Sequence, residues 1–461
     1  MSLTKVTYAM IESAPANVFD YGAVGDGIAD DTVAIQAAIN SGAGVVDIGN
    51  GTFVCGQLTL VSDVSLVGNG VGNTILKLKT ASNTQLLRGT SISNISITGV
   101  EFDGNKTNQS VAANLLQFFS CDNVVITNSS IHDSKQDGVY FTDCANCLIE
   151  SNNIANNDRN GISCGAAVDT SVNMKILHNI ITGHSGASDI GLSLEPVYKS
   201  IIYGNVLVDN HDAITVVGAA AQTINCDLNV IRDNLITATA ASNRGIVVSG
   251  AAATTNKNLF SGNNISGNYI LGFVATSTEE DTFTDNIVKD ITGANSSAFQ
   301  FTSLTKSVVA NNHAVGCQLY GMFFETSNNN TVSGNYIADN SQLATGVRDG
   351  IRLNNSSNNS VSGNYSSGAD QGYGIKENGT VTTNAYAGNS VVGNNISGYQ
   401  LVAGSRSSID GSVYFAAAPT TGTWAVGNIV YAITPASGGF IGWVCTVAGT
   451  PGTWKTWGVI S

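Results

Sequence analysis

The chain repeats one short pattern of small and apolar positions along most of its length. Runs of the form small–apolar–x–apolar recur from DGVYF to YGIKE, and successive runs lie 22 to 32 residues apart. The small residues of these runs are Gly138, Gly161, Gly191, Ala213, Gly245, Gly272, Ala298, Gly321, Gly350 and Gly374. Each repeat contains several short β-forming runs separated by Asn, Gly or Ser turns, and no helical period lies between them. Such an array predicts an all-β fold, a parallel β-helix whose coils stack and bury a continuous core.

A second column of the repeat is asparagine, preceding another apolar position. Its members are Asn153, Asn179, Asn205, Asn234, Asn264, Asn286, Asn312, Asn335, Asn364 and Asn395. Asparagine tolerates the left-handed turn conformation, and its amide can bond to the equivalent amide one coil further along. We therefore expect a stacked asparagine ladder inside the solenoid.

The two ends of the chain depart from the repeat. Residues 1–16 form a lead-in segment, and GDGIADDTVAIQAAINSG then predicts a short capping helix with Asp31 as its N-cap. Val33, Ile35, Ala38 and Ile39 supply the buried stripe of this helix. After residue 410 the composition changes, because all 4 tryptophans and three of the 5 prolines lie there. We predict a parallel β-helix over residues 17–410 and a small β module over residues 411–461.

Composition excludes several classes of protein. With 461 residues, 11% charged and 43% hydrophobic, the chain is neither a coiled coil, nor a collagen, nor disordered. A net charge of −14 without a basic patch argues against a nucleic-acid partner. No apolar run is long enough for a transmembrane helix, and the N-terminus lacks the apolar core of a secretory signal. The 8 scattered cysteines read as buried free thiols, and we expect no metal and no cofactor.

The opening of the chain resembles a known family. The segments NVFDYGAVGDGIADDTVAIQAAI, GTFVCGQLTLVSDVSLVGNGVGNTIL and GVEFDGN look like the pectate-lyase-like β-helix family of bacteriophage tailspikes. The resemblance covers about residues 17–400 and implies a right-handed, single-stranded, pectin-lyase-like solenoid. It further implies a homotrimer attached to the phage tail or baseplate through its N-terminus, with no membrane insertion. Such a protein is made in the bacterial cytoplasm and acts, on the virion tail, against capsule or O-antigen polysaccharide at the host surface. The C-terminal module would then serve trimerisation or carbohydrate binding.

Pectin itself is not the expected substrate. Polygalacturonases carry NTD, DD, GHG and RIK motifs, whereas here His184 stands in GHSG and the others are missing from the repeats. The calcium carboxylate cluster and the RxPxxR-like segment of pectate lyases are also absent from the sequence.

Chemistry-bearing side chains concentrate in four consecutive repeats between residues 132 and 212. The candidates for catalysis are Glu195, Asp158, Asp189 and Asp212, and those for substrate binding are Arg159, Asp137, Lys135, His211 and Tyr140. Because parallel coils stack about 4.8 Å apart, equivalent positions of adjacent repeats lie side by side. Carboxylates so placed fall within the ~5–9.5 Å separations used by glycosidases. Each acidic candidate has a structural alternative, since acids at solenoid turns are usually solvated or cap the turn.

Glu195 is the strongest single candidate. GLSLEP resembles a GIDIEP-type motif of phage depolymerases whose Glu lies in the groove, although Ser193 stands here where that motif is acidic. We expect one carboxyl of raised pKa to protonate the glycosidic oxygen while a second activates water. Arg159 would hold a sugar hydroxyl or an acidic substituent.

Three function classes remain open. The main hypothesis is a polysaccharide depolymerase that hydrolyses glycosidic bonds. A lyase acting by β-elimination on a uronate polymer is the alternative, with Lys135, Arg159 and His211 as its bases and cations. The net charge argues against this alternative, because the general field repels an anionic polymer. The third class is a non-catalytic receptor-binding fibre.

Overall fold

The computed structural model describes residues 14–166, 171–218, 226–250, 255–294, 296–343, 345–402, 405, 407–410 and 412–461. Most of the lead-in segment, residues 1–13, lies outside the described residues. The chain divides into two compact units, Met1–Tyr269 and Ile270–Ser461, and each is described by itself. Strand β30 (Asn264–Thr276) contains the boundary. The predicted all-β parallel solenoid with a short helix is confirmed, whereas the domain boundaries at 16 and 410 stay predictions.

Unit 1 is a three-faced parallel β-helix, whose faces we name A, B and C. Face A contains β1 (Ala16–Asn17), β3 (Val45–Gly49), β6 (Ser65–Gly68), β9 (Ser93–Thr98), β12 (Asp122–Thr127), β15 (Leu148–Glu150), β19 (Lys175–Leu177), β23 (Ile201–Tyr203), β26 (Val230–Arg232) and β29 (Leu259–Ser261). Face B contains β2 (Asp26–Asp30), β4 (Gly51–Cys55), β7 (Thr74–Leu78), β10 (Glu101–Asp103), β13 (Ser130–His132), β16 (Asn153–Ala155), β20 (Ile180–Thr182), β24 (Val206–Val208) and the start of β27 (Leu235–Ser249). Face C contains β5 (Leu58–Thr59), β8 (Leu87–Thr90), β11 (Leu116–Phe119), β14 (Val139–Thr142), β17 (Ile162–Gly165), β21 (Ile190–Glu195), β25 (Asp212–Val217) and the end of β27. Short elements between them are η2 (Val18–Tyr21), η3 (Lys106–Asn108), β18 (Ser171–Val172), β22 (Val197–Tyr198) and β28 (Thr255–Asn256).

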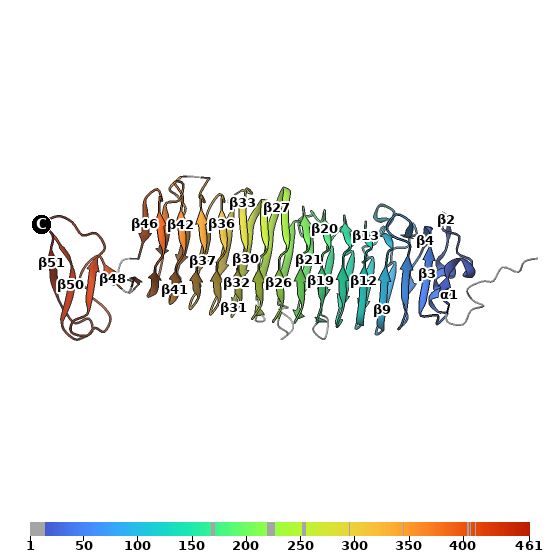
Figure 1. Ribbon diagram of the computed structural model, residues 1–461, viewed down its shortest axis with the longest axis horizontal. Coiled ribbons are helices and arrows are strands. Elements are labelled where there is room, and N and C mark those ends of the chain that lie inside the picture. Colours follow the sequence, from blue (N-terminus) through green and yellow to red (C-terminus); the bar gives the residue numbers. More distant parts are fainter. Residues whose placement is uncertain are drawn as a thin grey trace, which may run out of the picture. The chain divides into compact units, whose positions relative to one another are not determined.

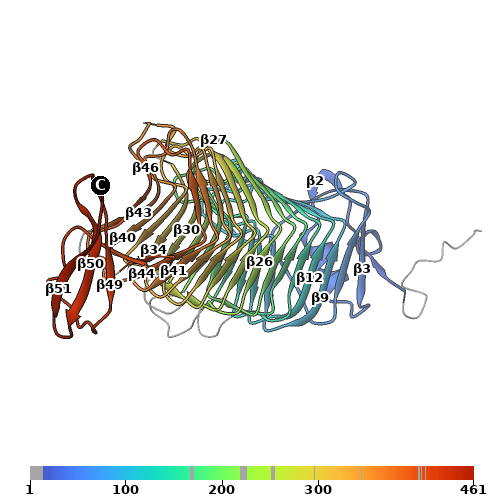
Figure 2. The ribbon, with the colours of Figure 1, turned by 60° about the vertical axis from the view of Figure 1, so that its left-hand side comes forward.

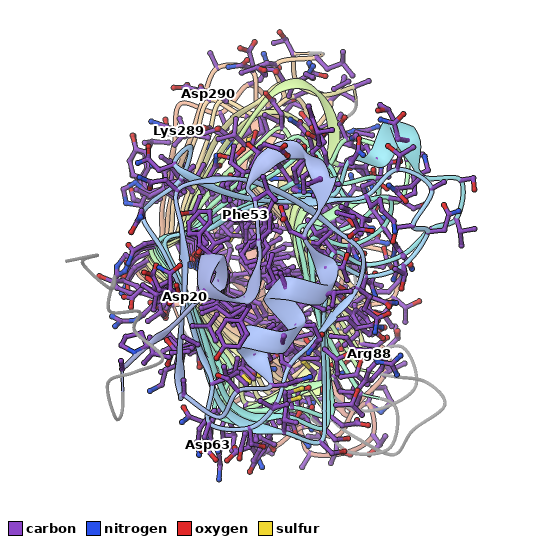
Figure 3. The ribbon with its side chains drawn as sticks, turned by 90° about the vertical axis from the view of Figure 1, so that its right-hand side faces the viewer. Asp20, Phe53, Asp63, Arg88, Lys289 and Asp290 are labelled. Atoms are coloured by element: carbon purple, nitrogen blue, oxygen red, sulfur yellow. The ribbon has the colours of Figure 1, made fainter. Side chains whose placement is uncertain are left out.

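Each strand of unit 1 pairs in parallel with its equivalent in the next coil, as the row of β9, β12, β19 and β26 illustrates (Figure 1). Alternate side chains point inward, because successive residues of a strand face opposite sides. Phe118 and Phe141 are paired in register on β11 and β14, and their rings stack with centroids 5.0 Å apart. Figure 3 shows Phe53 of β4 in the interior, with Asp63 and Arg88 at the periphery. The core is therefore a stack of apolar side chains, and chemistry is confined to the outward rows and the turns.

An asparagine ladder runs through each unit, as predicted, but its membership differs. In unit 1 each side-chain Nδ2 donates to the next Oδ1 at 2.9–3.0 Å through Asn152, Asn179, Asn205, Asn234 and Asn263. In unit 2 the ladder contains Asn286, Asn312, Asn335, Asn364 and Asn389. The predicted members Asn153, Asn264 and Asn395 were wrong, since Asn153 and Asn395 are exposed and none of the three belongs to this ladder.

The N-terminal capping helix α1 (Thr32–Ile39) is present, with two corrections. Asp31 occupies the N-cap position but makes no capping hydrogen bond, because its carboxylate accepts from the backbone N–H groups of Val24 and Gly25. The carboxylate of Asp30 accepts from the Thr32 N–H at 3.1 Å instead. Val33 is 81% exposed and does not belong to the buried stripe.

Unit 2 has a three-faced pattern of its own (Figure 2). Face A contains β32 (Thr282–Thr284), β35 (Val308–Ala310), β38 (Thr331–Ser333), β41 (Asn359–Ser362), β44 (Asn384–Ala387) and β47 (Ser408–Ile409). Face B contains β33 (Ile287–Ile291), β36 (His313–Val315), β39 (Tyr336–Ala338), β42 (Tyr365–Ser367) and β45 (Ser390–Val392). Face C contains the end of β30, β34 (Ser297–Thr302), β37 (Met322–Glu325), β40 (Ile351–Asn354), β43 (Tyr373–Asn378) and β46 (Ser397–Gln400). The remaining strands are β31 (Thr278–Glu279), β48 (Ser412–Phe415), β49 (Ile429–Ala432), β50 (Phe440–Val447) and β51 (Thr453–Val459).

The last strands of unit 2 have a small core of their own. β49, β50 and β51 pair antiparallel, and their core is formed by Phe415 of β48 with Trp424, Val430, Trp443 and Cys445.

All eight cysteines of the chain are buried as thiols rather than disulfides, as predicted. Among the described residues no helix is long and apolar enough to cross a membrane.

Candidate functional site

Four consecutive coils of unit 1 carry the predicted site residues at the start of, or on, face C. In register along this face, Tyr140 of β14 pairs with Ser163, which pairs with Ser193 of β21, which pairs with Thr215 of β25. One row further on, Gly165 pairs with Glu195. Small side chains thus occupy the outward row that follows Tyr140, and the charged candidates lie mainly in the turns that enter these strands.

Asp137 and Arg159 form the centre of this region. Asp137 is completely buried, and its Oδ1 accepts from the backbone N–H of Asn160 at 3.1 Å. The Nε of Arg159 lies 3.5 Å from the same oxygen, while about half of the Arg159 side chain is exposed. Within the described part of the chain, Oδ2 of Asp137 is buried without a hydrogen-bond partner. Burial raises the pKa of Asp137 to about 6, against the lowering by Arg159 and the Asn160 N–H, and the negative charges of Glu195 and Asp189 raise it further.

Asp189 and His211 lie beside this pair. Oδ2 of Asp189 accepts from the Gly186 N–H at 2.9 Å. Partial burial raises the pKa of Asp189 above its ordinary value, opposed by the Gly186 N–H, and the charges of Asp158, His211 and Arg159 also act on it. The His211 side chain is 23% exposed, and its Nδ1 lies 3.9 Å from Oδ1 of Asp212. Two carboxyls of raised pKa, a guanidinium and an imidazole therefore act on one another across adjacent coils.

Asp212 is held by a cation that the sequence reasoning missed. Arg244 donates to it twice, from Nε to Oδ1 at 3.1 Å and from Nη2 to Oδ2 at 2.6 Å. The two residues are in register on β25 and β27. A signal existed, since Arg244 immediately precedes Gly245 just as Asp212 precedes Ala213 in the repeat. Both oxygens of Asp212, which was predicted to be catalytic, therefore accept hydrogen bonds from Arg244.

Asp158 and Lys135 belong to a separate ion cluster at the edge of the site. Lys135 Nζ lies 2.8 Å from Asp158 Oδ2, and Lys106 Nζ lies 3.1 Å from Asp158 Oδ1. Partial burial alone would raise the pKa of Asp158, but the hydrogen bonds from Lys135 and Lys106 outweigh it and hold the pKa below its ordinary value. Asp158 is thus an ionised partner of two lysines, and a general-acid role does not suit it.

Glu195 and Tyr140 are the remaining predicted residues. Glu195 is exposed, and the hydroxyl of Ser193 donates to its Oε1 at 3.1 Å. The ring of Tyr140 is half-buried and packs edge-on against Phe119, with centroids 6.0 Å apart. Both side chains are open to a ligand on face C, and the roles assigned to all nine predicted residues stay predictions.

Comparison with known proteins adds the family. Residues 57–195 and 114–288 match the model described as "Right handed beta helix region", and together these matches span just over half of the chain. The chain belongs to the right-handed β-helix family. Residues 233–348 of this β-helix protein also match the model described as "Periplasmic copper-binding protein (NosD)".

Curated relatives of this β-helix protein come from Azotobacter vinelandii. Mannuronan C5-epimerase AlgE1 is 29% identical over 248 residues, which cover 42% of this chain and 17% of AlgE1. Alginate lyase 7 is 28% identical over 196 residues, covering 32% of this chain and 23% of the lyase. The chain therefore spans less than a quarter of the length of these two relatives.

Solved structures of similar fold include a phage protein. The tailspike of E. coli bacteriophage HK620, determined in complex with a pentasaccharide, superposes with a TM-score of 0.67 at 13% identity. The match covers 86% of this chain and 78% of the tailspike. At this identity the likeness is one of fold alone.

Two further histidine sites of the β-helix protein differ in character. His184 is fully buried between Asn157 and Asn210, and burial lowers its pKa to about 4 despite the hydrogen bond to Asn210. His184 is thus a neutral structural histidine at pH 7.

Asp103, His132 and Asp133 place ligand atoms within 4.8 Å of one another, which suits a cation. Lysines already neutralise that group, since Lys77 Nζ lies 2.8 Å from Asp103 and Lys106 Nζ lies 3.8 Å from Asp133.

Proposed function

We propose that this protein modifies a uronate-containing polysaccharide by removing the proton at C5 of a uronate residue, as a lyase or an epimerase. The observation that carries the proposal is the half-exposed Arg159 guanidinium, which lies 3.5 Å from buried Asp137. Asp189 interacts with both of these residues and with His211. The relatives named as mannuronan C5-epimerases and an alginate lyase support the same class of substrate. This choice favours the sequence-based alternative over glycosidic hydrolysis.

The chemistry assigns one task to each group. Arg159 pairs with the uronate carboxylate, which makes the adjacent C5–H more acidic because the charge that develops on the carboxylate is neutralised. His211 accepts the C5 proton through Nε2, because its Nδ1 is buried without a hydrogen-bond partner among the described residues and lies 3.9 Å from Asp212, whose carboxylate is already paired with Arg244. The electron pair left at C5 then either expels the oxygen at C4, which leaves as a hydroxyl after taking a proton from water and gives a lyase, or takes a proton from water on the opposite face, which gives an epimerase. Asp137 touches no substrate in this scheme and is a positioning residue for Arg159.

Hydrolysis is the second candidate, favoured by the raised pKa values of Asp137 and Asp189. A general acid must reach the glycosidic oxygen, however, and Asp137 exposes none of its surface. The tailspike identity, homotrimeric assembly and virion location expected from the sequence stay proposals.

The test is a reaction in deuterated water with alginate, its mannuronate-rich and guluronate-rich fractions, polygalacturonate and neutral capsular polymers. An epimerase incorporates deuterium at C5 without shortening the chains. A lyase shortens them and produces the ultraviolet absorbance of an unsaturated uronate, whereas a hydrolase shortens them without either signal. If no polymer is labelled, shortened or rendered absorbing, the enzyme proposal is wrong.

Two variants and one control locate the reaction. Arg159→Gln and His211→Gln are each expected to lower kcat/KM by about 10²-fold or more. Arg232→Gln is the matched control, because its side chain is 47% exposed against 49% for Arg159 and stacks on Tyr203 of face A. Equal loss in Arg232→Gln and Arg159→Gln would assign the effect to general charge rather than to the site.

A further inference from the structure

Unit 2 carries a cluster of three cations that the proposed reaction does not use. Arg352 and Lys376 are in register on adjacent face C strands, so equivalent backbone positions lie about 4.8 Å apart. The guanidinium groups of Arg348 and Arg352 each lie 5.5 Å from the ring centroid of Tyr320, and Nη1 of Arg352 donates to the Tyr320 hydroxyl at 2.8 Å. We call Arg348, Arg352 and Lys376 the unit 2 basic cluster.

The basic cluster carries more positive charge than its buried neighbour neutralises. Asp349 is 1% exposed, and its carboxylate interacts electrostatically with all three cations. Its Oδ2 lies 3.5 Å from Nη1 of Arg352. The Nε atoms of Arg348 and Arg352 are buried and have no hydrogen-bond partner among the described residues. Asp349 can balance only one of these three cations, in a chain whose net charge is −14.

A tyrosine-lined cavity adjoins the cluster within unit 2. Its volume is about 520 Å³, and its lining includes Tyr373, Tyr399, Tyr414 and Gln400. Lys376 joins the two features, because its Nζ lies 4.6 Å from the ring centroid of Tyr373 and it is in register with Gln400. The volume falls within the roughly 300–1,000 Å³ of ligand sites, and aromatic rings complement the apolar faces of pyranoses.

We propose that unit 2 binds a carboxylated polysaccharide at a site of its own, with sugar rings on Tyr373, Tyr399 and Tyr414 and a carboxylate paired by Lys376. The charge of the cluster selects an acidic chain over a neutral one. The proposal takes its class of polymer from the proposed function, but it requires no turnover.

Binding is tested with the full chain by electrophoresis in gels containing alginate or neutral dextran, and by calorimetry with alginate oligomers. Lys376→Gln is expected to weaken alginate binding about three- to tenfold, the range of one desolvated ion pair, and Lys376→Arg to restore most of it. The matched control is Lys199→Gln, which removes a lysine stacked 4.9 Å over Tyr198 in unit 1 and should leave binding unchanged. Unaltered circular dichroism verifies that each variant is folded.

The outcomes separate this inference from the reaction. Retardation in alginate gels that depends on Lys376 supports the site, even if no polymer is chemically changed. Equal weakening in Lys376→Gln and Lys199→Gln would show a general field effect and overturn it. A wild-type protein that migrates alike in alginate and dextran would also overturn it, whatever the reaction assay gives.

Discussion

Replacing Asp137 by asparagine should stabilise the protein at neutral pH while impairing its reaction. Burial raises the pKa of Asp137 from 3.8 to about 6. One pKa unit corresponds to about 1.4 kcal/mol, so keeping this carboxylate ionised in the folded state costs about 3 kcal/mol at pH 7. Because the folded-state pKa is raised, the contribution of the protonated group is complete below pH 3.8 and is lost as the pH rises through about 6. The neutral amide avoids that loss, so the gain from Asp137→Asn should be absent below pH 3.8, grow as the pH rises and be complete above about pH 6.

The assay is urea unfolding of both proteins across this pH range, followed by far-ultraviolet circular dichroism. Tryptophan fluorescence would report elsewhere, because all 4 tryptophans lie between residues 424 and 457. Asp158→Asn is the control, because Asp158 lies one coil further along and its pKa is lowered rather than raised. The lysines that lower the pKa of Asp158 make its ionised form stabilising, so this variant should lose stability at pH 7 and approach wild type as the pH falls.

Loss of stability in Asp137→Asn at pH 7, or a gain that does not change with pH, would refute this reasoning. The first result would mean that Asp137 is an ordinary structural ion pair, and the second would mean that the gain does not come from removing its charge. The expected combination of higher stability and lower kcat/KM is the trade-off of a carboxylate kept buried for function. It follows here because the amide no longer attracts the Arg159 guanidinium that lies 3.5 Å away.

Three further outcomes are expected. Asn205→Ala should cost about 3 kcal/mol or more of unfolding free energy, because it leaves buried ladder partners unsatisfied, whereas exposed Asn153→Ala should change little in the same urea titration. Burial lowers the pKa of His184 from 6.5 to about 4. The contribution of neutral His184 to stability is therefore complete above pH 6.5, and about 3 kcal/mol of it is lost as the pH falls to 4. In His184→Gln the free energy of unfolding should no longer change with pH over this range for that reason. Trp443→Ala should lower the free energy of unfolding of the last strands by about 3–5 kcal/mol, because Trp443 belongs to their small core. If the module predicted after residue 410 is independent, fluorescence of the remaining tryptophans should show these strands unfolding before the solenoid.

The solenoid was predictable because each coil solves the same packing problem with the same residue types. The ladder register was harder, because counting a column leaves an error of one residue where two asparagines adjoin. In the structure each ladder asparagine directly follows a residue of positive φ, as Ser151 precedes Asn152 and Gly388 precedes Asn389. Asn395 follows another asparagine and lacks this turn. The left-handed residue, rather than the spacing, therefore decides which amide points inward.

The candidate site was predictable in position but not in charge state. Column alignment brought Asp137, Arg159, Asp189 and Asp212 to one edge of face C, where the structure has them. The sequence does not show which oxygens are enclosed, so the burial of Asp137 and the pairing of Asp212 with Arg244 appeared only in three dimensions. Burial and pairing set the pKa values, and these distinguish positioning residues from groups that can meet a substrate.

The net charge of −14 does not exclude an anionic substrate, contrary to what the sequence alone suggests. At physiological ionic strength fields are screened over about 8 Å, so a polymer chain experiences the charges it touches rather than the total. The cations proposed to meet the polymer are Arg159, about half exposed beside face C of unit 1, and Lys376, partly buried on face C of unit 2. Asp137 and Asp349, which lie 3.5 Å from Arg159 and Arg352, are buried, whereas Glu195 on face C of unit 1 is exposed. Weaker binding of a uronate polymer at higher salt is the expected sign of these local cations.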